Sequence, residues 1–159
     1  MARCLIALGA NLGEPAATVR AALQQLAQQP GVTQVVASAL YQTAPVGGPA
    51  GQAVYVNAAA RFETDLSPQA VLALLQSLEQ QFGRARRETW GPRTLDLDLL
   101  LYGDAVVDEP GLRVPHPHLQ ERAFALIPLL DVLPEARIPG YGAARDAVSA
   151  LEMSNIHPL

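Results

Sequence analysis

The chain has 159 residues, of which 50% are hydrophobic and 16% are charged. This composition excludes a disordered protein and suits one domain spanning residues 1–159. The net charge of −4 argues against a nucleic-acid partner, and the single cysteine, Cys4, excludes an internal disulfide. The N-terminal apolar run, residues 4–8, is too short for a signal peptide or a membrane span. We therefore expect a cytoplasmic protein without a membrane partner, and a monomer, although self-association stays open.

A strand followed by a helix is predicted at the N-terminus. The strand covers residues 3–9 and leads into a turn over 9–13, whose two glycines permit positive φ. The helix begins near Pro15 and ends before Pro30, because apolar residues recur between them at helical spacing.

Two further strands and a second helix follow. The strands cover residues 32–41 and 54–62, and the proline- and glycine-rich segment between them, 44–51, is predicted to be a long functional loop. Ser67 is a good N-cap for an amphipathic helix, and Gly83 is its expected C-terminal stop.

The last part of the chain adds one strand and short helices. The strand covers residues 94–102, and helices are expected over 124–130 and 143–152. The resulting order, β-α-β-β-α-β, predicts an α+β, ferredoxin-like sandwich: an antiparallel sheet with helices packed on it and extra C-terminal helices. The face of the sheet away from the two main helices would be free for loops and ligand.

Two aspartates in the last strand are the strongest chemical signal. Alternation directs Leu95, Leu97 and Leu99 to the core and projects Asp96 and Asp98 together on the opposite face. Two carboxylates so placed repel each other unless a cation lies between them, and hard oxygen ligands suit Mg²⁺. Taken alone, the pattern is more often the polar outer face of a half-buried strand.

An arginine-rich segment, residues 83–93, lies directly before this strand. It holds four of the eleven basic residues, all of which are arginine, together with Trp90. The absence of lysine excludes a P-loop nucleotide site. Such a run is usually only a solvated loop. Beside an aspartate pair, however, arginines that bind phosphate and an indole that stacks on a flat ring indicate phosphoryl-type transfer from a metal–nucleotide complex.

Other polar residues allow a ligand role without requiring one. His116 and His118 have no third nitrogen or sulfur ligand nearby, so a zinc site is not expected, whereas a histidine that contacts phosphate is plausible. Tyr55 and Asn57 share a strand face and would suit a flat heterocycle, although, taken alone, a packed tyrosine and a turn-forming asparagine are the more common explanation.

Residues 90–98 resemble the signature of the 6-hydroxymethyl-7,8-dihydropterin pyrophosphokinase family. Five further blocks resemble the family in order, namely residues 8–13, 41–45, 55–59, 114–117 and 122–124. The resemblance covers nearly the whole chain. It implies an ATP-dependent diphosphotransferase of folate biosynthesis, which moves pyrophosphate from ATP to the pterin hydroxymethyl group and uses two Mg²⁺ ions.

The resemblance also implies site residues. Both metals would be bridged by Asp96 and Asp98, which with Arg84 and Arg93 would form the catalytic group. ATP would be bound by Gln76, Glu79, Arg84, Arg86, Arg93, Arg113, His116 and Arg122. The pterin would be bound by Thr43, Val46, Tyr55, Asn57, Trp90 and Phe124.

Two other functions remain compatible with the same fold. A non-catalytic ligand-sensing module would explain the sheet but not the aspartate pair beside the arginines. A Mg²⁺-dependent nucleotide hydrolase would use the same carboxylates and would differ in releasing AMP without the pterin. An RNA-binding domain would need exposed aromatics on central strands and a basic surface, and neither is expected here.

Overall fold

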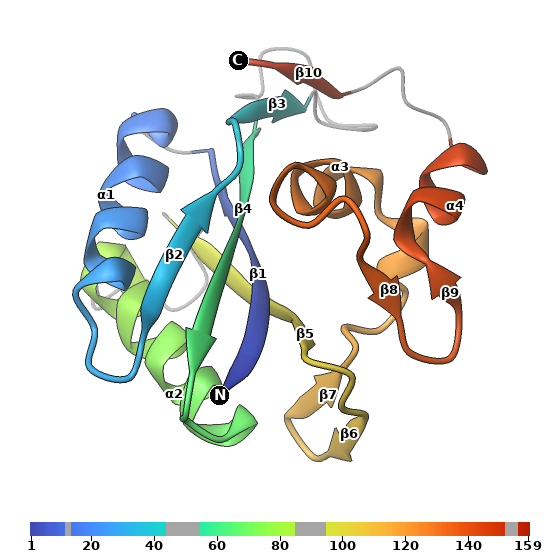
Figure 1. The fold of residues 1–159 in the computed structure, drawn as a ribbon. Coiled ribbons are helices and arrows are strands. Elements are labelled where there is room, and N and C mark those ends of the chain that lie inside the picture. The colour runs from blue at the N-terminus through green and yellow to red at the C-terminus, as the bar shows by residue number, and fades with distance from the viewer. Residues whose placement is uncertain (12–13, 44–54, 85–94, 152–155) are drawn as a thin grey trace.

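The computed structural model describes residues 1–11, 14–43, 55–84, 95–151 and 156–159 (Figure 1). Its central element is a six-stranded antiparallel sheet in the order β10-β3-β4-β1-β5, with β2 also paired to β4. The sheet strands are β1 (Ala2–Ala10), β2 (Thr33–Ala37), β3 (Tyr41–Thr43), β4 (Tyr55–Thr64), β5 (Asp96–Tyr102) and β10 (Ile156–Pro158). The helices are α1 (Pro15–Ala27), α2 (Pro68–Glu79), α3 (Ala123–Val132) and α4 (Ala144–Ser149).

Smaller elements complete the described chain. Two hairpins are formed by β6 (Val107–Glu109) with β7 (Leu112–Val114), and by β8 (Arg137–Ile138) with β9 (Gly142–Ala143). A π-helical turn, η1 (Gln80–Arg84), follows α2, and a 3-10 turn, η2 (Leu119–Glu121), precedes α3. None of these helices is long and apolar enough to cross a membrane, within the part of the chain described.

The sheet separates two hydrophobic cores. On one face, α1 and α2 cover β1, β4 and β5, and their apolar stripes bury Val19, Leu26, Leu75 and Leu78 against Phe62 and Leu97 (Figure 1). Proline at the first turn begins both helices, and the Ser67 hydroxyl accepts a hydrogen bond from the Ala70 N–H at 3.1 Å. The predicted β-α-β-β-α-β sandwich is confirmed.

The second face is partly covered, whereas the sequence predicted it to be free. α3 packs there and buries Leu126 and Leu129 against Leu5 and Leu100, and α4 packs on the outer side of α3 (Figure 1). α3 is hydrophobic on all sides, as a helix enclosed between a sheet and another helix should be. The polar residues on this face of the sheet therefore lie beyond the edge of the second core.

Two predicted boundaries were wrong for identifiable reasons. The strand expected over 32–41 is two strands, because Ser38 interrupts it: its N–H donates to the Ala59 carbonyl at 2.9 Å and its hydroxyl accepts from the Ala59 N–H at 2.8 Å. Gly83 does not stop the second helix, because η1 continues past it to Arg84.

The first strand and the last elements also differ from expectation. Gly9 lies inside β1 rather than in a turn, and its φ is not positive. The predicted loop over 44–51 lies outside the described residues. The short strands after Tyr102 were not predicted, because pairs of two or three residues carry too little periodicity to be detected.

Candidate active site

A row of residues crosses the sheet beyond the second core and forms the centre of the candidate site. Gly9 on β1 is directly paired with Asp96 on β5 and with Asn57 on β4, and Asn57 is paired with Tyr41 on β3. Directly opposed residues of antiparallel strands project from the same face. The register therefore places a carboxylate, a carboxamide and a phenol along one line.

Asp96 lies in this row, and Asp98 lies in the neighbouring row, two residues further along β5. Asp98 is paired with Ala7, one step along the same face, so the Cα atoms of Asp96 and Asp98 are about 6.5–7 Å apart. Both residues are partly exposed, whereas Leu97 between them is buried on the other face. The prediction that the two aspartates share a face opposite Leu97 is confirmed.

The donor set of this face suits a divalent cation bound together with phosphate. Among the described residues, no three His, Cys, Asp or Glu side chains gather closely enough to enclose a metal. Two carboxylates on a rigid strand provide only some of the oxygen ligands that Mg²⁺ takes, so water and substrate phosphates must complete the set. This arrangement fits Mg²⁺ that arrives with a nucleotide.

Glu79 fixes the backbone between the two aspartates. Its carboxylate accepts a hydrogen bond from the Leu97 N–H at 2.8 Å, and the residue is only 5% exposed. β5 is an edge strand of the sheet, so this bond ties its edge to the C-terminal end of α2. Gln76, one turn earlier on α2, is exposed. Both residues therefore lie near the edge that carries the aspartate pair.

His116 stands beside Asp98. Its backbone N–H donates to the Leu100 carbonyl at 3.0 Å, which fastens the segment to β5. On the ring, Nδ1 lies 2.9 Å from the Pro117 carbonyl and Nε2 lies 4.0 Å from Asp98 Oδ1. A carbonyl only accepts, so we assign the proton of the neutral ring to Nδ1, which leaves Nε2 as the acceptor.

Arg122 links His116 to an exposed aromatic ring. Its Nη1 lies 3.1 Å from both ring nitrogens of His116, and its guanidinium carbon is 4.7 Å from the centroid of Phe124. Arginine suits both contacts because its planar cation stacks on a ring while its edge donates hydrogen bonds. A continuous series of side-chain contacts therefore runs from Asp98 through His116 and Arg122 to Phe124.

The other end of the row resembles a site for a flat ring. Asn57 is 8% exposed, and its Nδ2 donates to Thr43 Oγ1 at 2.8 Å. Tyr55 alternates with Asn57 on β4, is paired with Thr43, and is 38% exposed. Sequence alternation predicted that Tyr55 and Asn57 share a face, and the burial of the intervening Val56 in the first core agrees.

Tyr41, which was not among the predicted site residues, connects this end of the row to α3. The Tyr41 hydroxyl donates to Asp131 Oδ2 at 2.6 Å, which joins β3 to the helix that begins with Phe124. Burial raises the pKa of Tyr41 to about 12, assisted by the hydrogen bond to the Asp131 carboxylate and by its charge. No sequence signal joins two residues 90 positions apart.

The remaining predicted residues are distributed as follows. Val46, Arg86, Trp90 and Arg93 lie outside the described residues, and Arg84 ends η1. Arg113 is on the exposed side of β7, where its Nε lies 3.3 Å from Asp108 Oδ1. Contacts in the described chain thus link Asp98, His116, Arg122 and Phe124 in one group and Thr43, Tyr55 and Asn57 in another. The strand register joins the two groups, because Asp96 and Asn57 are both paired with Gly9.

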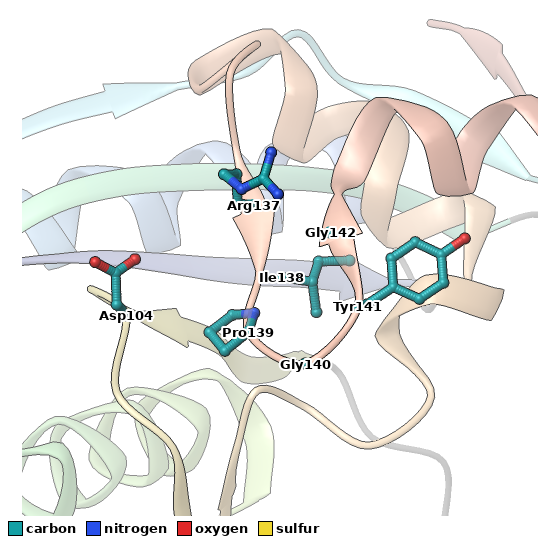
Figure 2. Close-up of a pocket in the computed structure, with 7 residues that line it drawn as sticks. All are labelled: Asp104, Arg137, Ile138, Pro139, Gly140, Tyr141 and Gly142. Carbon is teal, nitrogen blue, oxygen red and sulfur yellow. The ribbon is translucent and has the colours of Figure 1, made fainter.

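A surface cavity of about 540 Å³ lies elsewhere, around the β8–β9 hairpin. Figure 2 shows Arg137 on β8, Asp104 to one side of the hairpin and the Tyr141 ring on the other side. Asp104 follows the end of β5 opposite to the aspartate pair. The cavity contains none of the predicted site residues and does not combine two carboxylates, so we do not assign the chemistry to it.

Sequence comparison finds relatives along most of the chain. Residues 5–134 match the family model described as 7,8-dihydro-6-hydroxymethylpterin-pyrophosphokinase (HPPK). A Pseudomonas aeruginosa protein named 2-amino-4-hydroxy-6-hydroxymethyldihydropteridine pyrophosphokinase is 47% identical over 137 residues, which is 86% of this chain and 84% of that protein. A Methylorubrum extorquens protein of the same name is 39% identical over 156 residues, 98% of each chain.

Solved structures share the fold at low identity. A crystal structure described as HPPK-DHPS in complex with substrates matches with a TM-score of 0.76 and 11% identity, over 99% of this chain and 46% of that one. A Plasmodium falciparum HPPK-DHPS triple mutant matches with a TM-score of 0.72 and 14% identity, over 94% of this chain and 44% of that one. This chain therefore spans slightly less than half the length of those structures.

Proposed function

The chain belongs to the 7,8-dihydro-6-hydroxymethylpterin-pyrophosphokinase family, and from that membership we propose how its residues carry the reaction. The enzyme transfers pyrophosphate from ATP to the hydroxymethyl group of 6-hydroxymethyl-7,8-dihydropterin, a step of folate biosynthesis. The hydroxymethyl oxygen attacks the β-phosphorus and loses its proton. The bond from that phosphorus to the α,β-bridging oxygen breaks, and AMP leaves. Family membership decides against a non-catalytic sensing module.

We propose that Asp96 and Asp98 hold two Mg²⁺ ions with the triphosphate. Bound there, Mg²⁺ would neutralise phosphate charge and orient the β-phosphoryl group for in-line attack. The carboxylates need a fixed spacing for this, which the extended backbone of β5 and the Glu79 bond to Leu97 supply. The rigid strand thus does the positioning that phosphoryl transfer mainly requires.

The nucleotide would lie along the β5 edge. His116 lies beside Asp98 and holds Arg122, whose guanidinium would donate to phosphate oxygens. Arg84 and Arg93 would stabilise charge in the transition state. We propose the ATP-binding set Gln76, Glu79, Arg84, Arg86, Arg93, Arg113, His116 and Arg122. Glu79 would act through the strand backbone, since its side chain is buried.

The pterin would lie at the other end of the row. Tyr55 and Phe124 each expose more than a third of their surface and would stack on its two faces, while the Asn57 carboxamide reads its edge. We propose the pterin-binding set Thr43, Val46, Tyr55, Asn57, Trp90 and Phe124. Hydrogen bonding between Asn57 and Thr43 would pre-organise the polar part of this set.

One observation carries this proposal: the strand register aligns the carboxylate of Asp96 with the carboxamide of Asn57 across Gly9. Adjacent strands lie about 4.8 Å apart, so the two groups are separated by roughly 10 Å. A metal-bound triphosphate and a flat ring can therefore meet over the same face. We propose that one domain over residues 1–159 acts as a monomer in the cytoplasm, where the free thiol of Cys4 suits a reducing compartment.

A product assay tests the activity. With Mg²⁺ and ATP, AMP is expected only when the pterin is added, and in equal amount to the pterin diphosphate, as measured by chromatography. AMP or ADP released at the same rate without the pterin would instead identify a nucleotide hydrolase. Tyr141→Ala, at the distant hairpin, is the matched control and should react as the parent does.

A further inference from the structure

Gly9 is a glycine that the backbone does not require. It lies within β1, paired on both sides, and its φ is outside the left-handed region where glycine is favoured. Glycine in a strand interior weakens the strand and often marks a place where another group approaches closely. By contrast, Gly140 in the β8–β9 turn has a φ of 82° and open space around it, so its backbone explains it.

The space above Gly9 is bounded by the side-chain carboxamide of Asn57, which we propose binds the pterin. A Cβ atom built on Gly9 would lie 3.2 Å from Asn57 Oδ1, a contact tighter than nine in ten of those that real Cβ atoms make. Asn57 has little room to retreat, since it is 8% exposed and its Nδ2 is held by Thr43 Oγ1 at 2.8 Å. A methyl group at position 9 would have to displace the Asn57 carboxamide.

The same position separates the two substrate groups. Gly9 is the residue paired with both Asp96 and Asn57, so its missing side chain leaves open the part of the sheet face between them. The hydroxymethyl oxygen must meet the β-phosphorus between the metal-binding and pterin-binding ends of the row. Ala7, the next residue on this face, is paired with Asp98 and Ala59 and packs partly against the second core instead.

We propose that Gly9 is a positioning residue of the transfer step: the absence of its side chain keeps Asn57 in place and leaves room for the two reacting groups to meet. This inference rests on the proposed function of the row. It predicts an unusual signature, in which a substitution that the fold tolerates reduces the rate of the reaction.

Gly9→Ala tests this inference against Gly140→Ala. Gly9→Ala should fold and melt close to the parent temperature, because the gain from alanine, which fits this backbone angle and restricts the unfolded chain, offsets the cost of displacing Asn57. It should bind a non-hydrolysable ATP analogue with Mg²⁺ within about threefold of the parent, yet lose about tenfold to a hundredfold in kcat, because small misplacements of reacting groups cost that much. Gly140→Ala should melt lower and keep the parent kcat, because alanine is strained at positive φ.

Three results would overturn the inference. The first is a Gly9→Ala variant whose kcat and KM stay within twofold of the parent. The second is a Gly9→Ala variant that does not fold, because the glycine would then be required for folding and not for positioning the reacting groups. The third comes from a double-mutant cycle with Asn57→Ala. We expect the combined loss to be smaller than the product of the single losses, and independent losses would show that Asn57 does not mediate the effect. The parent's own AMP production decides the proposed function separately.

Discussion

Tyr55 and Phe124 are exposed aromatic residues with different surroundings. Phe124 is covered on one side by the Arg122 guanidinium at 4.7 Å, whereas Tyr55 is 38% exposed at the start of β4. Large aromatic rings contribute most when buried, so exposed rings beside a polar row favour a ligand that covers them. At the scale of single residues, Tyr55 gives the clearest test of the pterin end.

Tyr55→Ala should weaken pterin binding and spare ATP. Loss of one stacking face is expected to raise the pterin Kd by roughly tenfold, equivalent to about 1.4 kcal/mol, while the Kd of an ATP analogue with Mg²⁺ stays within about twofold. Calorimetric titration of each ligand measures both values. Tyr141→Ala, another exposed tyrosine, provides the control. An equal weakening of both ligands would contradict the assignment of separate pterin and nucleotide ends.

Individual site residues were predictable to the extent that they follow strand alternation. Asp96, Asp98, Tyr55 and Asn57 were placed on their faces from the sequence, because side chains alternate with period two. The contact of Arg122 with His116 and Phe124 depends on how η2 and α3 dock, which no local pattern encodes. The importance of Gly9 was also missed, since its signal is the close approach of Asn57 from another strand.

At the scale of elements, the Tyr41–Asp131 hydrogen bond joins the strand that carries Thr43 to the helix that carries Phe124. Both elements contribute to the proposed pterin site, but they belong to different parts of the chain. Elements themselves were predictable where they were long and periodic. The division of residues 32–41 into β2 and β3 was not, because it results from the pairing of Ser38 with Ala59 on another strand.

Tyr41→Phe should change the pH dependence of stability. An unfolded tyrosine titrates near pH 10, whereas burial and Asp131 raise the pKa of Tyr41 to about 12 in the folded protein. Its stabilising contribution is therefore complete below pH 10 and is lost as the pH rises towards 12. Cys4 and Tyr102 have pKa values shifted in the same direction, so the comparison is between variant and parent.

The measurement is the urea midpoint of both proteins from pH 8 to pH 12. We expect Tyr41→Phe to be less stable than the parent at pH 8 and the difference to shrink above pH 10. A constant difference across this range would show that the hydroxyl bond contributes nothing to the pH dependence. Tyr141→Phe, whose hydroxyl is on the exposed hairpin, should match the parent throughout.

At the scale of the whole molecule, the sheet lies between the helices α1 and α2 on one side and α3 on the other (Figure 1), and it keeps two hydrophobic cores apart. The proposed site residues lie on its second face. β1 contributes to both cores and to the polar row. Leu5 and Leu8 are buried in opposite cores, and Gly9 lies in the polar row. The antiparallel α+β architecture was predictable from element order. The covering of the second face by α3 was not, because a helix apolar on all sides does not reveal which surface it contacts.

Cys4 reports on the integrity of this architecture. It is fully buried in the first core, and burial, with a smaller effect of the Glu63 charge, raises the pKa of its thiol to about 12. The reactive thiolate is therefore scarce and inaccessible in the folded protein. Labelling by a thiol reagent at pH 8 should be negligible without urea and complete above the urea midpoint. Rapid labelling of the native protein would contradict the burial of β1.

The most direct test of the central claim is the binding of a non-hydrolysable ATP analogue to the parent and to Asp96→Asn/Asp98→Asn, with and without Mg²⁺. The substitution keeps the shape of both side chains and removes both charges. By calorimetry, we expect the parent to bind the analogue at least about tenfold more tightly with Mg²⁺ than without it, and the variant to lose that difference while keeping the parent melting temperature. An equal effect of Mg²⁺ on both proteins would contradict the claim that these two carboxylates hold the metal.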